Sequence, residues 1–343
     1  MTLWPSGETA RVIPTGGPAL VEGNRAIWVP SSPLRAIRAQ APNAKVQFDD
    51  GTDPLSAAAL AASSDVAIVF VSQYEQEDWD LPSLGFTDYF HSPPIDQDAV
   101  VAAVAAANAH TVVVLETGGA HNMPWLDAVR AVLAAWYPGQ RGGEAIANLL
   151  FGAVNPSGKL PITFPASVAD LPHPQIPIPP DSTSVFKVDY SEGALVGYKW
   201  YDAKNLTPLF PFGFGLSYTT FSFTNATVTD NLDASSPEIE VAFDLENTGP
   251  VAGSEVAQIY LTLPAAVGGP PKRLVGWRKV FLQPGERRRV TVAIDPQDSS
   301  HPLSYWDTDA HGWRIAPGDY VIYVGNSSNS TSLTLAGTVR IGG

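Results

Sequence analysis

Two uninterrupted apolar runs constrain the fold most strongly. They are residues 66–71 (Val-Ala-Ile-Val-Phe-Val) and 111–115 (Thr-Val-Val-Val-Leu). A continuous apolar run of this length indicates a strand buried on both faces, as in a parallel sheet. Between them, Asp96 can cap a helix that runs through Ala107, with apolar residues at helical spacing. The alternation of strand and helix predicts a parallel α/β layer.

Further elements are expected around these two strands. Ser32 and Pro33 form a start signal for a short helix, and residues 56–62 are rich in alanine, which favours a second helix. We also expect helices over 125–135 and 143–151 and a short strand over 45–48.

From about Ser217 the hydrophobic pattern changes to period two. About seven alternating strands separated by Gly/Pro turns predict an immunoglobulin-like β-sandwich, similar to a fibronectin type III domain. The expected strands are 221–230, 238–247, 255–263, 279–282, 287–294, 318–324 and 332–341. The sequence therefore predicts an α/β domain over 1–165, a proline- and aromatic-rich linker over 166–216, and an all-β sandwich over 217–343.

An acidic segment, residues 74–84, directly follows the first buried strand. Ligands of α/β proteins bind at the carboxyl ends of parallel strands. Neighbouring like charges raise one another's pKa, which favours a protonated general acid near neutral pH. A solvated acidic loop and a calcium loop are the alternatives, although the residue order of a calcium loop is missing. The four carboxylates of the segment are Glu75, Glu77, Asp78 and Asp80.

Composition limits the kinds of partner and chemistry. The 343 residues carry a net charge of −14, which disfavours nucleic acid and anionic membranes as partners. No cysteine is present, so thiolate chemistry is excluded, and the six histidines show no metal-ligand spacing. We therefore predict no metal and no cofactor. His121 is the exception among the histidines because it lies near the Gly118-Gly119 corner, but we favour a structural or solvent role for it. No apolar run is long enough to span a membrane and no signal peptide is evident, which leaves the compartment open.

Several strings, in this order, resemble the C-terminal half of glycoside hydrolase family 3, of the bacterial β-glucosidase type. Residues 77–84 (EDWDLPSL) are similar to the E-G-x-D-R-P-S-L loop of that family, and residues 112–119 to its V-V-V-L-x-x-G-x segment. Residues 136–145 (WYPGQRGGEA) and 155–161 (NPSGKLP) continue the resemblance. The bridge into the family's fibronectin-like domain has counterparts in 190–198 and 208–218.

The resemblance implies retaining hydrolysis of a terminal β-linked glucose or a similar sugar. In that family, an aspartate on an N-terminal barrel is the nucleophile and a glutamate from the α/β domain is the acid/base. Glu77 matches this glutamate by its place in the loop, and Glu75 is the second choice. Trp79, Trp200 and Tyr201 are the expected substrate-binding residues, with packing between the two domains as the alternative for the last two.

The chain also departs from the family pattern. It contains no counterpart of the barrel, which needs roughly 200 or more residues, and no nucleophile segment. Asp78 replaces a usual glycine and Leu81 a usual arginine. We therefore expect little hydrolysis by the chain alone, with a barrel supplied by a missing segment or a separate chain. A non-catalytic module that binds glycans or a partner enzyme, and a gene fragment, are the alternatives.

Overall fold

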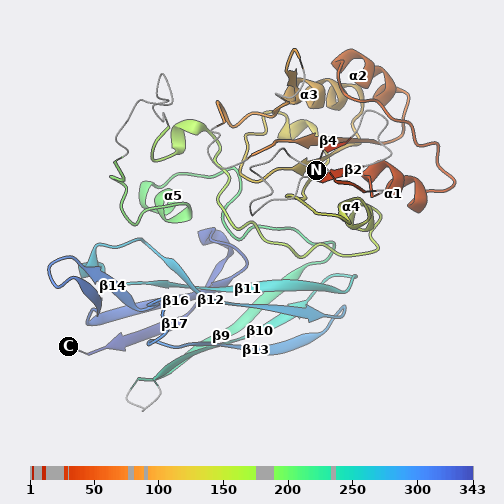
Figure 1. The fold of residues 1–343 in the computed structure, drawn as a ribbon. Coiled ribbons are helices and arrows are strands. Elements are labelled where there is room, and N and C mark those ends of the chain that lie inside the picture. Colours follow the sequence, from red (N-terminus) through yellow and green to blue (C-terminus); the bar gives the residue numbers. More distant parts are fainter. Residues whose placement is uncertain are drawn as a thin grey trace. The chain divides into compact units, whose positions relative to one another are not determined.

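The structure is a computed structural model that describes residues 2–3, 10–12, 27–29, 31–75, 81–88, 92–174, 189–232 and 237–342. The chain divides into two compact units, 1–154 and 155–343, and each is described by itself. Figure 1 shows the ribbon of both units with the elements labelled.

The first unit is built on a three-stranded parallel sheet with the order β4-β7-β8. In register, Ala67 pairs with Thr111 and Val112 with Ala131. Alternate residues of β4 face opposite helix pairs, since Ala67 and Val69 pack against α2 and α3 while Ile68 and Phe70 pack against α1 and α4. Figure 1 shows the two helix pairs on opposite sides of β4. The elements named here are α1 (Pro33–Gln40), α2 (Pro54–Ala62), β4 (Ala67–Ser72), α3 (Gln97–Ala107), β7 (Thr111–Glu116), β8 (Ala131–Ala134) and α4 (Gly142–Leu150).

Short pairs of strands complete this unit. An antiparallel three-stranded sheet has the order β1-β2-β3, and β5 pairs with β6. A single 3-10 turn, η2, precedes β8. These elements are β1 (Thr2–Leu3), β2 (Ala10–Val12), β3 (Ile27–Val29), β5 (Thr87–Asp88), β6 (Ile95–Asp96) and η2 (Leu126–Ala128).

The predicted helix starts are confirmed. The Ser32 hydroxyl accepts a hydrogen bond from the Arg35 N–H, and Pro33 occupies the first helical turn of α1. Asp96 caps α3 by accepting from the Ala99 N–H at 3.0 Å. These starts were predictable because each cap is made by residues within three positions of one another.

Two predicted elements are wrong. Residues 125–135 do not form a helix but contain η2 and then β8, whose ladder with β7 continues to an Ala135 N–H···O=C Leu115 bond of 2.9 Å. Sheet pairing overrides the helix propensity of this alanine-rich stretch. Residues 45–48 form no strand; Val46 instead packs against the small cluster that α1 and α4 share.

The second unit contains the predicted sandwich of two antiparallel sheets, β13-β10-β9 and β12-β11-β16-β17. All seven predicted strands are confirmed, and the bounds of β10 and β13 agree with the prediction at both ends. Period-two side chains such as Ile239, Val241 and Phe243 are fully buried between the sheets. The strands are β9 (Phe221–Asn231), β10 (Glu238–Asn247), β11 (Gly253–Thr262), β12 (Arg273–Leu282), β13 (Arg287–Ile294), β16 (Gly318–Gly325) and β17 (Leu333–Ile341).

The prediction missed one hairpin of this unit. The segment that precedes the sandwich, from Asn155 onward, belongs to the same unit. The hairpin pairs β14 (Ser304–Asp307) with β15 (Gly312–Ile315). The preceding segment contains η3 (Val168–Asp170) and α5 (Tyr198–Lys204), and two further 3-10 turns are η4 (Ala265–Val267) and η5 (Ser330–Ser332). In the part of the chain that the structure describes, no helix is long and apolar enough to cross a bilayer.

Candidate active site

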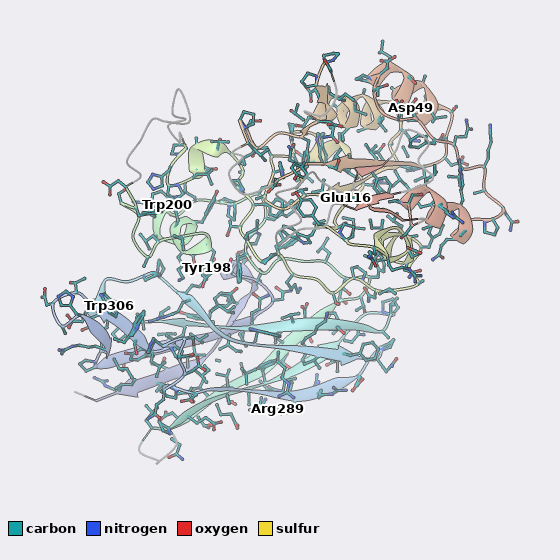
Figure 2. The ribbon with its side chains drawn as sticks, in the orientation of Figure 1. Asp49, Glu116, Tyr198, Trp200, Arg289 and Trp306 are labelled. Atoms are coloured by element: carbon teal, nitrogen blue, oxygen red, sulfur yellow. The ribbon has the colours of Figure 1, made fainter. Side chains whose placement is uncertain are left out.

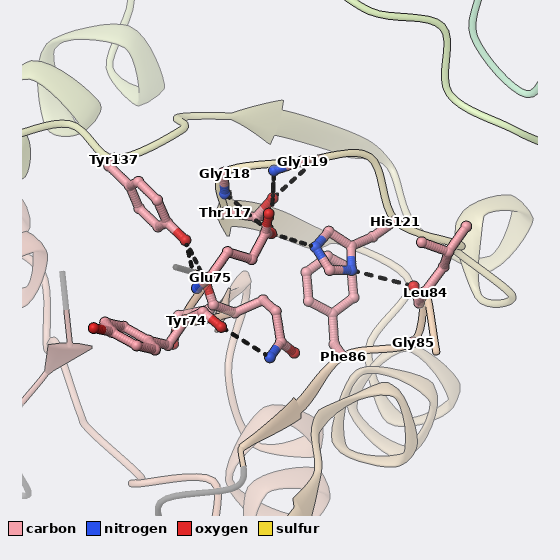
Figure 3. A network of polar contacts seen from close by, with 12 residues as sticks. Tyr74, Glu75, Leu84, Gly85, Phe86, Thr117, Gly118, Gly119, His121 and Tyr137 are labelled. Carbon is pink, nitrogen blue, oxygen red and sulfur yellow. Dashed lines mark hydrogen bonds and ion pairs between the residues drawn. The ribbon is translucent and has the colours of Figure 1, made fainter. Parts of the chain in front are cut away.

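The candidate site lies where β4 and β7 end. The Gln73 N–H donates to the Glu116 carbonyl at 3.1 Å, which extends the parallel ladder one residue beyond β4. Glu75 then meets the turn that follows β7, as Figure 3 shows. Because both strands are parallel, their carboxyl ends bring together two segments that are distant in the sequence.

Glu75 is held by three donors on one carboxylate oxygen. Its Oε1 accepts from the Gly118 N–H at 3.2 Å, from the Gly119 N–H at 3.1 Å and from His121 Nε2 at 3.0 Å. The Glu75 side chain is 25% exposed, so the carboxylate is mostly withdrawn from water. Burial raises the pKa of Glu75, but the hydrogen bond and charge of His121 and the two glycine N–H groups outweigh it, so the pKa is lowered. Glu75 is thus ionised near neutral pH and is a poor proton donor.

His121 connects Glu75 to the other end of the acidic segment. Its Nδ1 lies 3.2 Å from the carbonyl oxygen of Leu84, which can only accept, so Nδ1 carries a proton. Its Nε2 lies 3.0 Å from the Glu75 carboxylate oxygen, which also accepts, so the ring makes both hydrogen bonds only when it carries two protons. The His121 side chain is 1% exposed and stacks on the buried Phe86 ring, with centroids 4.3 Å apart.

The two glycines allow the close approach of the carboxylate. A Cβ added at Gly119 would lie 2.9 Å from Glu75 Oε2, and one at Gly118 would lie 3.0 Å from the Tyr137 ring and 3.1 Å from Glu75 Oε2. A side chain at either position would push the Glu75 carboxylate away from the backbone N–H groups that now bind it. The turn after β7 is therefore shaped around this carboxylate.

Tyr137 holds the backbone of the same segment. Its hydroxyl donates to the Gln73 carbonyl at 2.8 Å and accepts from the Glu75 N–H at 3.0 Å. Burial and the negative charge of Glu75 raise the pKa of Tyr137 to about 12. The phenol therefore stays neutral and keeps both hydrogen bonds across the ordinary pH range.

A second carboxyl group lies at the end of β7. Glu116, which is labelled in Figure 2, is paired in register with Ser72. It is 2% exposed. Burial raises its pKa to about 7, and its Oε1 has no hydrogen-bond partner among the described residues. Among all the described residues, no group of three or more His, Asp or Glu side chains is arranged to hold a metal ion.

The structure reaches only some of the residues that the sequence singled out. Glu75 and His121 lie in the network described above. Glu77, Asp78, Trp79 and Asp80 lie outside the described residues.

Trp200 and Tyr201 belong to the second unit, on α5. Trp200 is labelled in Figure 2. It donates its indole N–H to the Asp170 carbonyl at 2.9 Å, and Lys204 Nζ lies 4.8 Å from the Trp200 ring centroid. Tyr201 is 4% exposed. A substrate-binding role for either residue stays a prediction.

Sequence reasoning missed Tyr137 and the function of the two glycines. Tyr137 entered the sequence analysis only as part of the family-like string 136–145, with no role of its own. Gly118-Gly119 was recognised as a strand-to-loop corner, but no group was predicted to bind there. A glycine pair directly after a buried strand does signal a close approach of another group, but it does not identify that group.

Comparison with known proteins identifies the family. The family model for the glycosyl hydrolase family 3 C-terminal domain matches residues 6–218. The chain belongs to glycosyl hydrolase family 3. A fibronectin type III-like domain model matches residues 255–328. The resemblance and the fold class expected from the sequence are thereby confirmed.

The family relatives are β-glucosidases and are longer than this chain. It is 39% identical to thermostable β-glucosidase B of Acetivibrio thermocellus and 42% identical to β-glucosidase B of Emericella nidulans, and each match covers 82% of the chain but only 36% and 33% of those proteins. The solved structure of DesR, a β-glucosidase from Streptomyces venezuelae in complex with D-glucose, is 40% identical with a TM-score of 0.72, over 84% of this chain and 35% of DesR. The chain thus spans about a third of the length of these family members.

Proposed function

We propose that this chain is the C-terminal part of a retaining β-glucosidase and that Glu77 is its general acid/base. The substrate would be a terminal β-linked glucoside or a short β-glucan. A barrel on a missing segment or a separate chain would supply the nucleophile. The names of the relatives support the reaction class, since three proteins that match along most of this chain are β-glucosidases.

The observation that carries the assignment is the state of Glu75. The acidic segment offers two glutamates, and the carboxylate of Glu75 is already committed to three donors with a lowered pKa. A general acid must hold a proton and be free to transfer it. Glu75 therefore fits an anchoring role, and Glu77 is left as the glutamate of the segment for proton transfer.

The location of the anchor supports the same conclusion. Glu75 begins the segment at the carboxyl edge of a parallel sheet, which is where α/β proteins bind their ligands. A retaining mechanism needs two carboxyl groups about 5–5.5 Å apart, one as the nucleophile and one as the acid/base. On this proposal the two groups come from different parts of the complete enzyme.

The test joins this chain to a barrel. The C-terminal part of the Acetivibrio thermocellus enzyme is replaced by this chain, and hydrolysis is measured with an alkyl glucoside and with a dinitrophenyl glucoside. We expect Glu77→Ala to lower kcat for the alkyl glucoside by about 10²–10⁴-fold, the usual contribution of a general acid or base. The first step with dinitrophenyl glucoside should be much less affected because that leaving group needs no proton. Azide should restore turnover and yield the β-glucosyl azide.

Controls separate proton transfer from general damage. Asp127→Asn changes an exposed acid on η2 and should leave both substrates unaffected. A Glu77→Ala chimera with equal losses on both substrates and no azide product would exclude the acid/base role. Turnover by the purified chain alone that survives Glu77→Ala would exclude it as well. If the chain binds β-glucans but the chimera does not hydrolyse either substrate, the non-catalytic module is favoured instead.

A further inference from the structure

We propose that His121 is a positioning residue that clamps both ends of the segment carrying Glu77. One imidazole is bonded to Glu75 at the start of the segment and to Leu84 at its end. The catalytic consequence rests on the proposed function, whereas the clamp itself can be tested without any activity.

The geometry joins opposite sides of one ring to opposite ends of one segment. Nε2 lies 3.0 Å from Glu75 Oε1, and Nδ1 lies 3.2 Å from the Leu84 carbonyl oxygen, with residues 76–83 between them in the sequence. The same turn adds a second bond to the far end, because the Asn122 N–H donates to the Leu84 carbonyl at 2.9 Å. Figure 3 shows the ring between the two ends. The imidazole therefore bridges the two ends, together with the backbone N–H groups of the same turn that hold each end separately.

The clamp depends on charge as well as on shape. Both ring nitrogens face acceptors, so the ring must carry two protons to make both bonds. A buried cation is costly without a partner, and here the Glu75 carboxylate supplies the opposite charge. Phe86 covers one face of the ring, with an interplanar angle of 26°, and fixes its plane. The ring is thus held in orientation by contacts that do not involve the segment itself.

Catalysis would depend on this clamp through distance. A displacement of about 1 Å in a catalytic group can cost about 10²-fold in rate. A glutamine at position 121 has one donor group, so it can hold one end of the segment while its carbonyl oxygen faces the acceptor at the other end. We expect His121→Gln to increase the separation between Glu75 and Leu84 while the acid/base glutamate at position 77 is still present.

The first experiment uses the chain alone with 15N-labelled histidine. In the wild type at neutral pH, we expect His121 to show protons on both ring nitrogens, assigned by their loss in His121→Gln. Glu75→Gln should convert this ring to a single-proton form, because the amide no longer supplies a negative charge. His110→Gln is the matched control, since the His110 ring is exposed and its Nδ1 lies 3.0 Å from the Asp65 carbonyl oxygen, with no carboxylate partner among the described residues. A single-proton ring in the wild type, or a two-proton ring that persists in Glu75→Gln, would overturn the clamp.

The second experiment uses the barrel chimera. We expect His121→Gln to lower kcat for the alkyl glucoside by about 10- to 100-fold, with little change in KM or in the rate with dinitrophenyl glucoside, and without rescue by azide. Glu75→Gln should give a similar loss, and the double variant should lose no more than either single variant because the two residues act as a unit. Unchanged kcat in His121→Gln would refute the positioning role. If Glu77→Ala itself behaves like the control, the proposed function fails, and the ring protons of the first experiment decide the clamp.

Discussion

Substitution of Gly119 by alanine tests the architecture of the site most directly. The added Cβ would lie 2.9 Å from Glu75 Oε2, whereas an ordinary contact begins at 3.4 Å. The carboxylate must therefore retreat by about half an ångström. Its bonds to the Gly119 N–H at 3.1 Å and to His121 Nε2 at 3.0 Å would then reach the limit of a useful hydrogen bond.

The expected cost follows from these bonds. A hydrogen bond to a charged group contributes about 1.5–3 kcal/mol. Replacing glycine by alanine also restricts the unfolded chain, which returns about 0.4–1 kcal/mol. We therefore expect Gly119→Ala to lower the free energy of unfolding of the α/β unit by about 1–2 kcal/mol.

The assay must report on this unit alone, because the chain has two. Native-state hydrogen exchange of the β4 and β7 amides, followed with increasing denaturant, measures the opening of their sheet. Gly158→Ala is a control in the second unit, where nothing lies within 4 Å of the added Cβ, and it should leave the exchange of these amides unchanged. In a Glu75→Ala background the obstruction is gone, so Gly119→Ala should then cost nothing. An equal cost in both backgrounds would refute the reasoning.

Three further predictions concern ionisable groups. The pKa of Glu75 is lowered from its ordinary value of 4.5, so its ionised form stabilises the fold above about that pH. This stabilisation is lost as the pH falls through the folded-state pKa, so the free energy of unfolding should fall less steeply with acid in Glu75→Gln. The pKa of Tyr137 is raised from 10 to about 12, so its contribution to stability is complete below pH 10 and is lost as the pH rises through 12. Tyr137→Phe should remove this loss of stability at alkaline pH, and a spectrophotometric titration of the phenol should show that Tyr137 ionises over the same range. In the second unit, Lys159 Nζ lies 2.7 Å from Glu255 Oε1, with side chains 11% and 5% exposed; Lys159→Met should cost about 3–5 kcal/mol in urea unfolding by leaving a buried charge unpaired, and adding Glu255→Gln should recover part of it.

Local signals made much of the fold predictable. The caps of α1 and α3 and the period-two strands of the sandwich depend on residues that are close in the sequence. Residues 125–135 were mispredicted because their composition favours a helix, whereas the parallel edge of β7 selects a strand. The β14-β15 hairpin was missed because its four-residue strands give too short a pattern to show a period.

The Glu75 network lies at the strand end to which the acidic segment pointed, but its partners were not predictable. A cluster of acids after a buried strand indicated where to look. The partners of Glu75 are Gly118, Gly119, His121 and Tyr137, which lie between 43 and 62 positions further along the chain. Only the register of β4 against β7 brings them together, and no short-range pattern encodes that register. For this reason the sequence analysis favoured only a structural or solvent role for His121.

The segment before the sandwich has a practical consequence for how members of this family are dissected. Asn155 accepts from the Ser217 hydroxyl and from the Tyr218 N–H and donates to the Ala252 carbonyl, while buried Gln258 donates to the Gly213 carbonyl. An expression boundary drawn at the first regular strand would sever all of these bonds and uncover the outer side of β11. Recombinant sandwiches should therefore start at Asn155, and gene shuffling between family members should cut at the same place, so that the segment travels with the sheet it covers.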